Sequence, residues 1–239
     1  MTRHEYFLED SYCRELESSI TAMEDDDIRL EKTIFYPRGG GQPADKGQVI
    51  HQGQEYTVDK IKRTKDGIYL KLKGDTSALQ PGDTVLQQVD WDYRYQLMKH
   101  HTSLHILSAV VWDKFEAKVT GGTIYQNKAR LDFDLDDFSQ ELAEELVDEV
   151  NDIIAQDHQI EISFVDREVA ESDPALIRTK INLLPKFITE IRLVKIGDVD
   201  IQADGGLHVH STAEIGRIKL IDTDNKGKGR KRIAIGTVS

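Results

Sequence analysis

The sequence has one cysteine and no long apolar run. Cys13 is the single cysteine among 239 residues, so no disulfide can form within the chain, whereas small secreted proteins use several cysteines. No stretch approaches the roughly 18 consecutive apolar residues of a membrane-spanning helix. The N-terminal residues are charged throughout and lack the apolar core of a signal peptide. We therefore expect a cytoplasmic protein with no membrane partner.

Lys and Arg are also missing from a long acidic segment. Between Leu131 and Asp166 there are 13 acidic residues and no basic one. Removing these 13 charges from the net charge of −12 leaves +1 for the rest of the chain. A net charge of −12 argues by itself against a nucleic-acid partner, but here it is concentrated in one segment. The opposite extreme is the basic run from Lys226 to Arg232.

The pattern of apolar residues changes near residue 88. Before it, short apolar runs such as 33–36 and 68–72 alternate with Gly, Pro and Asp, which favours a small β-barrel or sandwich. After it, helical and strand patterns mix. We expect helices over 91–115 and 139–156, and strands over 160–165, 190–196 and 208–221. The sequence thus predicts an α+β fold with two domains, a β-barrel over 1–88 and an α+β domain over 89–239.

Two histidines four residues apart form the first candidate site. His101 and His105 share one face of the expected helix, so both imidazoles could reach one metal ion. Thr102 stands where the zinc metalloprotease motif has its general-base glutamate, so the pattern is not that of a protease. The alternative is a pair of ordinary helix histidines, hydrogen-bonded or exposed to water.

The second candidate site is the segment from Asp204 to His210. Two glycines separate Asp204 from the next histidine and let the backbone turn sharply and approach a ligand closely. His208 and His210 project from one face if a strand begins at Leu207, so either Asp204 or His210 could join His208 as a metal ligand. A tight hairpin turn with a surface histidine is the alternative.

Together the two segments resemble a known zinc site. The order and spacing of His101, His105, Asp204 and His208 resemble the editing domain that alanyl-tRNA synthetase shares with threonyl-tRNA synthetase. That family has HxxxH on a helix and a later CxxxH. The segment from Gly39 to Gly47, with Gln42 and Asp45, resembles the family's glycine-rich motif GGQxxDxG. The match covers nearly the whole chain and leaves no room for an aminoacylation domain, so the sequence resembles the freestanding, medium-length AlaX proteins.

This resemblance implies a fold, a cofactor and a reaction. The expected fold is a β-barrel domain followed by an editing domain of the threonyl/alanyl-tRNA synthetase second-additional-domain type. The expected reaction is hydrolysis of the ester that links serine, and sometimes glycine, to tRNA(Ala), without an obligatory protein partner. One Zn²⁺ per chain is expected, held by three histidines with Asp204 in or just beyond the coordination shell. We expect the catalytic set to be His101, His105, Asp204, His208, Gln42 and Thr123, of which Thr123 is included for the selectivity reason given below.

One residue departs from the family pattern. Asp204 stands where the family usually has cysteine, and a carboxylate is a harder ligand than a thiolate. Three outcomes are open: Asp204 binds the metal, it orients His208 or a water, or the site has lost its metal. Neither a phosphate-binding loop nor a Ser-His-Asp arrangement is present in the sequence.

Specificity and tRNA binding need further residues. An apolar pocket discriminates poorly against an added hydroxyl, so a donor such as Thr120 or Thr123 is expected to bind the serine hydroxyl. Phosphate contacts require basic side chains. The candidates are Arg38, Arg94, Lys99, Lys128, Arg130 and the run from Lys226 to Arg232. The competing functions are a zinc-dependent esterase of small substrates and a non-catalytic module that binds aminoacyl-tRNA.

Overall fold

The computed structural model describes residues 4–136, 138–172, 176, 189–225 and 230–238. Contacts between Cα atoms divide the chain into two compact units. The first unit, which we call the barrel unit, comprises residues 1–39 and 43–95. The second, which we call the histidine unit, comprises residues 40–42 and 96–239. No helix among the described residues is long and apolar enough to cross a membrane.

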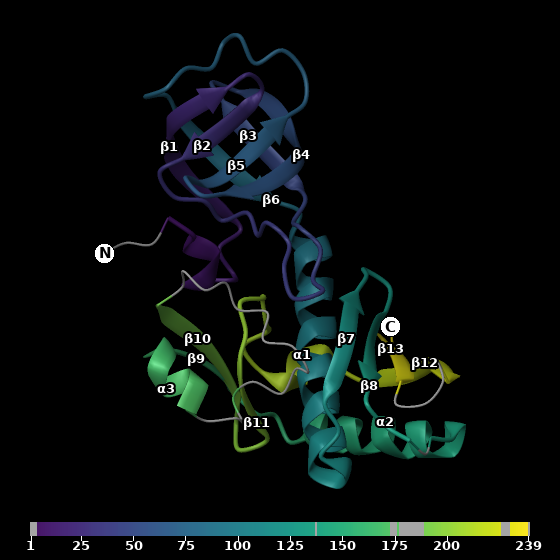
Figure 1. The fold of residues 1–239 in the computed structure, drawn as a ribbon. Helices are drawn as coiled ribbons and strands as arrows, with labels where there is room; N and C mark the ends of the chain where they lie inside the picture. Colours follow the sequence, from purple (N-terminus) through teal and green to yellow (C-terminus); the bar gives the residue numbers. More distant parts are fainter. Residues whose placement is uncertain (1–3, 137, 173–175, 177–188, 226–229, 239) are drawn as a thin grey trace. The chain divides into compact units, whose positions relative to one another are not determined.

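The barrel unit is built on six antiparallel strands that close on themselves in the order β1-β2-β5-β4-β3-β6 (Figure 1). The strands are β1 (Glu15–Glu24), β2 (Asp27–Leu30), β3 (Gly47–His51), β4 (Gln54–Thr64), β5 (Gly67–Leu72) and β6 (Thr84–Val89), preceded by the short helix η1 (Tyr6–Leu8). Closure leaves no unpaired strand edge and encloses apolar side chains such as Ile28, Val49 and Leu70, none of which is exposed. The predicted N-terminal barrel is therefore confirmed.

One predicted strand of the barrel is wrong. Residues 34–36 are buried and extended but pair with no strand. Their polar groups are bonded by side chains instead, because the Gln87 Oε1 accepts hydrogen bonds from the Ile34 amide at 3.1 Å and from the Thr33 hydroxyl at 3.0 Å. The Tyr36 amide donates to Asp45 Oδ2 at 2.7 Å. Apolar composition thus predicted burial correctly, while the hydrogen-bond partners decided against a strand.

Arg94 and Asp45 form a buried ion pair within the barrel unit. Neither side chain is exposed, and their closest atoms, Nη2 and Oδ2, lie 2.5 Å apart. The remaining guanidinium hydrogens reach the backbone carbonyl oxygens of Ser11, Cys13 and Ile34. Because Arg94 is enclosed and fully used in this way, the prediction that it contacts tRNA phosphates is wrong.

The histidine unit contains two sheets with helices packed against them (Figure 1). A four-stranded sheet has the order β12-β13-β8-β7, and a three-stranded sheet has the order β11-β10-β9. The helices and strands that complete the unit are α1 (Trp91–Phe115, from residue 96 on), β7 (Val119–Ile124), β8 (Ala129–Phe133), α2 (Gln140–Ala155), β9 (Ile160–Asp166), α3 (Arg167–Ser172), β10 (Glu190–Ile196), β11 (Asp200–Ala203), η3 (Thr212–Ile215), β12 (Ile218–Asn225) and β13 (Lys231–Thr237).

Helix α2 shows how the acidic segment folds. Ser139 caps its N-terminus by accepting a hydrogen bond from the Leu142 amide, and Leu146, Val150 and Ile154 form a buried stripe. α2 packs against β12 through this stripe, and acids such as Glu144 face water. The mixed α+β class and both predicted helices are confirmed.

The last predicted strand is wrong in its first half. Residues 208–211 form no strand, and η3 follows them before β12 begins at Ile218. Gly216 has φ +75°, a conformation that favours glycine and breaks the extended path. His208 and His210 therefore do not alternate along one strand face, and the positions of their side chains depend on a loop.

Candidate metal centre

Four side chains of the histidine unit converge on one buried point. His101 and His105 come from successive turns of α1, while Asp204 and His208 come from the loop after β11. One ligand atom of each residue lies within 4.8 Å of the others. The ring centroids of the three histidines are 4.4–5.1 Å apart. His100 and His210 do not belong to this cluster.

The distances within the cluster fit a metal ion. Ligand atoms about 2.1 Å from one tetrahedral zinc ion lie about 3.4 Å from one another. The His208 Nε2 is 3.1 Å from Asp204 Oδ2, and the His101 Nε2 is 3.7 Å from Asp204 Oδ1. Three imidazoles and one carboxylate are also a donor set that zinc accepts. The residues present therefore fit the ion that the resemblance implies.

Each histidine has a different polar group at its Nδ1. The His101 Nδ1 lies 3.0 Å from the Gln42 Oε1, and the His208 Nδ1 lies 3.1 Å from the Thr102 hydroxyl. The His105 Nδ1 lies 3.5 Å from Asp200 Oδ2, an ion-pair distance that is long for a hydrogen bond. Such contacts at Nδ1 favour the tautomer whose Nε2 carries the free lone pair.

Gln42 connects the glycine-rich motif to the cluster. Besides His101, its Oε1 accepts a hydrogen bond from the Leu207 amide at 2.9 Å, which fixes the orientation of the Gln42 amide. Gly41, at φ +86°, passes close to β7, where a Cβ would lie 2.8 Å from the Gly122 carbonyl oxygen. The Ile124 amide donates to the Gly41 carbonyl at 2.9 Å. The glycines thus allow this segment to pair with β7 and to present Gln42 to His101.

The loop that carries Asp204 is held from two sides. Arg192, on β10, donates from Nη1 to the carbonyl oxygens of Asp204 and Gly206, both at 3.0 Å. The Gly206 amide donates to Asp204 Oδ2 at 2.5 Å. A Cβ at Gly206 would lie 2.2 Å from His101 Cε1, so no larger residue fits without displacing that ring. The carboxylate position is therefore determined by the loop itself.

Electrostatics favour neutral imidazoles at His101 and His208 beside an ionised Asp204 carboxylate. Burial lowers the pKa of His101 to about 4, and burial together with the neighbouring histidines lowers the pKa of His208 well below its usual value. Burial also acts to lower the pKa of His105, but Asp200 and Asp204 outweigh it and the pKa is raised. Burial acts to raise the pKa of Asp204, yet the three histidines bring that pKa well below its usual value. The lowered pKa values of His101 and His208 suit metal ligands, because a protonated imidazole cannot coordinate.

The two threonines proposed for specificity lie on β7, outside the four-residue cluster. The Thr120 Oγ1 is buried and has no hydrogen-bond partner among the described residues. Thr123 is half-buried and adjoins the glycine-rich segment, since a Cβ at Gly41 would lie 3.5 Å from the Thr123 Cα. Asp45, which also belongs to the glycine-rich motif, is bonded to Arg94 and Tyr36.

Sequence reasoning missed Asp200, Arg192 and the role of Thr102. A signal for Asp200 exists in the segment from Asp198 to Asp204, where polar and apolar residues alternate strictly. This period of two is typical of a strand and places Asp200, Gln202 and Asp204 on one face. The structure forms β11 there, and the Gln202 side chain donates to Asp200 Oδ2 at 2.7 Å.

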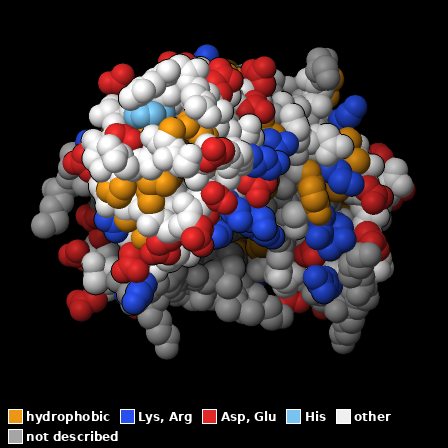
Figure 2. Space-filling model, turned by 90° about the horizontal axis from the view of Figure 1, so that it is seen from above, with side chains coloured by type: hydrophobic (Ala, Val, Ile, Leu, Met, Phe, Trp, Pro, Cys, Tyr) orange, Lys and Arg blue, Asp and Glu red, His pale blue; other side chains and the backbone are white. Residues whose placement is uncertain are grey.

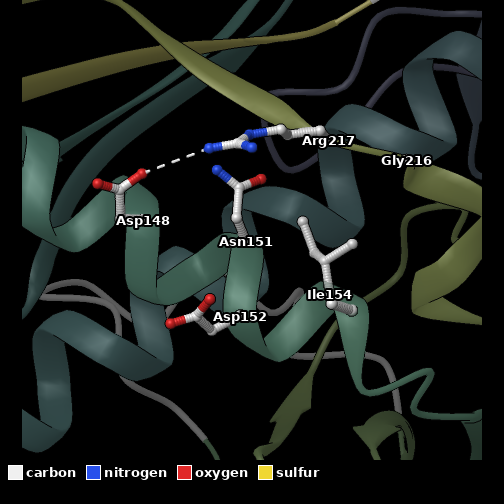
Figure 3. A pocket seen from close by; sticks show the side chains of 7 residues that line it. Asp148, Asn151, Asp152, Ile154, Gly216 and Arg217 are labelled. Carbon is white, nitrogen blue, oxygen red and sulfur yellow. Dashed lines mark ion pairs between the residues drawn. The ribbon is translucent and has the colours of Figure 1, made fainter.

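A separate pocket of about 440 Å³ lies beside α2. It is lined by Asp148, Asn151, Asp152, Ile154, Ala155, Gly216 and Arg217, and it shares no residue with the histidine cluster (Figure 3). Asp148 and Arg217 point toward each other in Figure 3, with 3.9 Å between their closest charged atoms, and both are largely exposed. The Asn151 side chain donates from Nδ2 to the Ile218 carbonyl oxygen at 3.0 Å and accepts at Oδ1 from the Ile218 amide at 2.8 Å. This pocket contains no group poised for catalysis.

Comparison with known proteins agrees with the fold. Residues 191–234 match the family model of the threonyl and alanyl tRNA synthetase second additional domain, and residues 7–93 match the model of class II (A) tRNA synthetases. An alanyl-tRNA editing protein AlaX-M from Saccharolobus solfataricus is 39% identical over 96% of both chains. AlaX-M from Methanosarcina barkeri is 34% identical over 98% of both chains. AlaX-L from Pyrococcus horikoshii is 34% identical over 95% of this chain and 56% of its own.

The fold and these matches define a protein with an editing domain of the synthetase type. At 39% identity over nearly the full length of an AlaX-M protein, the chain belongs to the AlaX family of alanyl-tRNA editing proteins. Members of that family are aminoacyl-tRNA deacylases, so the predicted family and the predicted class of enzyme are confirmed.

Proposed function

We propose that this protein is a trans-editing enzyme that removes wrongly attached serine from tRNA(Ala). The observation that carries the proposal is the convergence of His101, His105, Asp204 and His208 in a chain of the AlaX family. In the reaction, water adds to the ester carbonyl, the bond to the ribose oxygen breaks, and that oxygen takes a proton. Because an aminoacyl ester is already activated, the site needs to supply mainly positioning and charge stabilisation.

One zinc ion per chain is part of this proposal. The three histidines and Asp204 would hold it, since one ligand atom of each converges with the others at distances that a tetrahedral ion accepts. When bound, zinc supplies Lewis-acid charge that can activate a water or orient the amino group of the substrate. Gln42 would act as a positioning residue, because its Oε1 fixes the ring of His101 and the backbone of Leu207 together.

Selectivity for serine would depend on a hydroxyl partner. Thr120 is the better candidate of the two threonines, because its Oγ1 is buried without a partner and would pair with a substrate hydroxyl. An alanyl group would leave that buried oxygen unpaired, which costs about 1–3 kcal/mol. Thr123 would shape the pocket beside it. Glycine has no hydroxyl either, so Gly-tRNA(Ala) would be hydrolysed less well than Ser-tRNA(Ala).

Contact with tRNA would use arginines around Asp132. Asp132 is 2% exposed and forms two hydrogen bonds with Arg232, at 2.6 and 2.9 Å. Arg230 and Arg130 approach it with one nitrogen each, at 3.2 and 3.4 Å, and have further N–H groups for phosphate oxygens. Figure 2 shows Lys and Arg side chains in groups among Asp and Glu on the face drawn. Lys226 and Lys228 of the predicted basic run lie outside the described residues.

A hydrolysis assay tests the proposed function. Labelled Ser-tRNA(Ala), Gly-tRNA(Ala) and Ala-tRNA(Ala) are incubated with the protein, and release of the amino acid is followed. We expect release in the order serine, glycine, alanine, and inhibition by excess uncharged tRNA. Failure to release serine would instead support a binding module. Hydrolysis of small esters that uncharged tRNA does not inhibit would support an esterase.

A further inference from the structure

The metal cluster contains no sulfur. Its donors are three imidazoles and the carboxylate of Asp204. The only cysteine of the chain, Cys13, belongs to the barrel unit, where its thiol donates to the Glu15 carbonyl oxygen. Thiolate ligands favour soft ions, whereas carboxylates favour hard ones such as Mn²⁺. The identity of the fourth donor should therefore set the range of ions that this centre accepts.

We infer that Asp204 is a direct metal ligand and that it shifts the centre's preference away from soft ions and toward harder divalent ions. In this view Zn²⁺ and Co²⁺ bind, Mn²⁺ competes measurably, and the soft ion Cd²⁺ loses the advantage that a thiolate would give it. The inference rests on the proposed metal centre but not on its reaction. It concerns how the side chain at position 204 changes the relative affinities of the centre for different divalent ions.

Two carboxylates near the cluster occupy different sides of the imidazole rings. Asp200 faces the Nδ1 of His105 at 3.5 Å, which is where an orienting carboxylate stands in metal sites. Asp204 instead faces the Nε2 of His208 at 3.1 Å and the Nε2 of His101 at 3.7 Å. On both rings this Nε2 lies opposite the Nδ1 that contacts Gln42 or Thr102. Asp204 therefore stands on the metal side of the rings, and Asp200 stands behind one of them.

The two oxygens of Asp204 have different surroundings. The Gly206 amide donates to Oδ2 at 2.5 Å and so fixes the plane of the carboxylate. Oδ1 receives no hydrogen bond from a described residue and points to the side of His101. Since Arg192 holds the backbone carbonyl of the same residue, the carboxylate is placed without help from an ion. This geometry provides one free oxygen for coordination and one that is held in position.

Cobalt spectroscopy tests whether position 204 is in the coordination shell. The full-length protein is stripped of metal with a chelator and loaded with Co²⁺. A cobalt–thiolate bond gives a strong near-ultraviolet charge-transfer band, which a cobalt–carboxylate bond lacks. We expect no such band in the wild-type protein and a clear one in Asp204→Cys. Asp198→Cys is the matched control, because it adds a thiol at an exposed position outside the cluster and should give no band.

Competition between ions tests the preference itself. The affinities of Cd²⁺ and Mn²⁺ are measured with chelating indicators in the wild-type protein and in Asp204→Cys. We expect the ratio of Cd²⁺ to Mn²⁺ affinity to rise by on the order of 10-fold or more in the variant. Asp204→Glu, which keeps the oxygen donor, should leave the ratio within a factor of about 3 of wild type.

The outcomes are separable from those of the deacylation assay, since no tRNA is present. A thiolate band in wild-type protein, no band in folded Asp204→Cys, or equal affinity ratios in both would each overturn the inference. If Asp204→Cys does not fold, Asp204→Asn replaces it. That variant should bind Co²⁺ at least about 10-fold more weakly while circular dichroism is unchanged, and unaltered affinity would overturn the inference.

Discussion

Each of the two units of this protein encloses ionisable groups, but the hydrogen-bond partners of these groups differ between the units. In the barrel unit, the Arg94–Asp45 pair is saturated, because backbone carbonyls and the Tyr36 amide use the remaining donors and acceptors. In the histidine unit, the Nδ1 of each ring lies beside a polar neighbour, and one ligand atom of each of the four residues lies within 4.8 Å of the others. Removing one partner of a saturated buried pair destabilises a fold, whereas a buried cluster of converging imidazole and carboxylate groups is suited to bind an ion.

The largest effect is expected from removing one histidine of the cluster formed by His101, His105, Asp204 and His208. His208→Ala removes one ligand, so we expect loss of bound zinc and a fall in Ser-tRNA deacylation by on the order of 10³-fold. Zinc per chain and the initial rate of serine release measure the two effects. His210→Ala is the control, since His210 is exposed and outside the cluster, and it should retain both. A His208→Ala protein that keeps stoichiometric zinc would contradict the proposed centre.

The second prediction concerns loss of the buried ion pair between Arg94 and Asp45. Arg94→Met leaves the buried Asp45 carboxylate without its partner, so the free energy of unfolding should fall by about 3–5 kcal/mol. Denaturant titration of the full-length protein measures this change. The exposed pair of Arg63 with Glu5 is the comparison, because Arg63→Met should cost no more than about 1 kcal/mol. Equal costs for the two variants would show that burial does not distinguish these pairs.

A third prediction concerns the carboxylate behind His105. Asp200→Asn keeps the size of the side chain but removes its charge, so zinc affinity should fall by about 10- to 100-fold with the fold unchanged. Competition with a chelator of known affinity gives the value, and circular dichroism checks the fold. Asp198→Asn removes a charge two residues away at an exposed position and should leave affinity unaltered. Similar losses of zinc affinity in both variants would mean that the net charge near the cluster, and not the contact between Asp200 and His105, determines the affinity.

Specificity gives a fourth, smaller effect. Thr120→Val removes the buried hydroxyl, so the preference for Ser-tRNA(Ala) over Ala-tRNA(Ala) should fall by about 10-fold. Ratios of kcat/KM for the two substrates measure it. Thr123→Val should change the ratio less. If Thr123→Val has the larger effect instead, the hydroxyl partner has been assigned to the wrong threonine.

The smallest effect is expected on tRNA binding. Arg130→Gln with Arg230→Gln should weaken binding a few-fold and lower the slope of log affinity against log salt by about 1–2. Binding is measured at several salt concentrations. Lys62→Gln, an exposed residue of the barrel unit paired with Asp27, is the control. An unchanged slope would place the phosphate contacts on other residues.

The helices could be predicted from the sequence because their signals are local. α1 begins at Trp91 and ends at Phe115 as predicted, and α2 follows Ser139, a residue that favours the N-cap. The β1–β2 hairpin gave no such signal. Five of the ten residues of β1 are Glu or Ser, which have little strand propensity, and its turn contains Asp25 at φ 53°. Pairing with distant strands, rather than local preference, makes it a strand.

The convergence of the four candidate residues could be predicted from the sequence, but the residues that support them could not. A spacing of four on a helix identified His101 and His105, and two glycines identified the loop around Asp204. The contacts of Asp200 and Arg192 depend on how β10 and β11 pack, which spacing does not reveal. The acidic segment shows the same limit. Asp132 counts as one of its 13 acids, yet it is buried beneath arginines and adds nothing to the exposed acidic face of α2.

The absence of sulfur from the proposed metal centre also bears on oxidative damage. Peroxide oxidises a cysteine thiolate stepwise to sulfenic and sulfinic acids, and a zinc site that depends on that thiolate loses its ion. Carboxylates and imidazoles do not enter this series of reactions. Cys13 can be oxidised without changing any donor of the cluster, since it belongs to the other unit. Proofreading by this protein should therefore continue under peroxide exposure that would disable a thiolate-ligated counterpart.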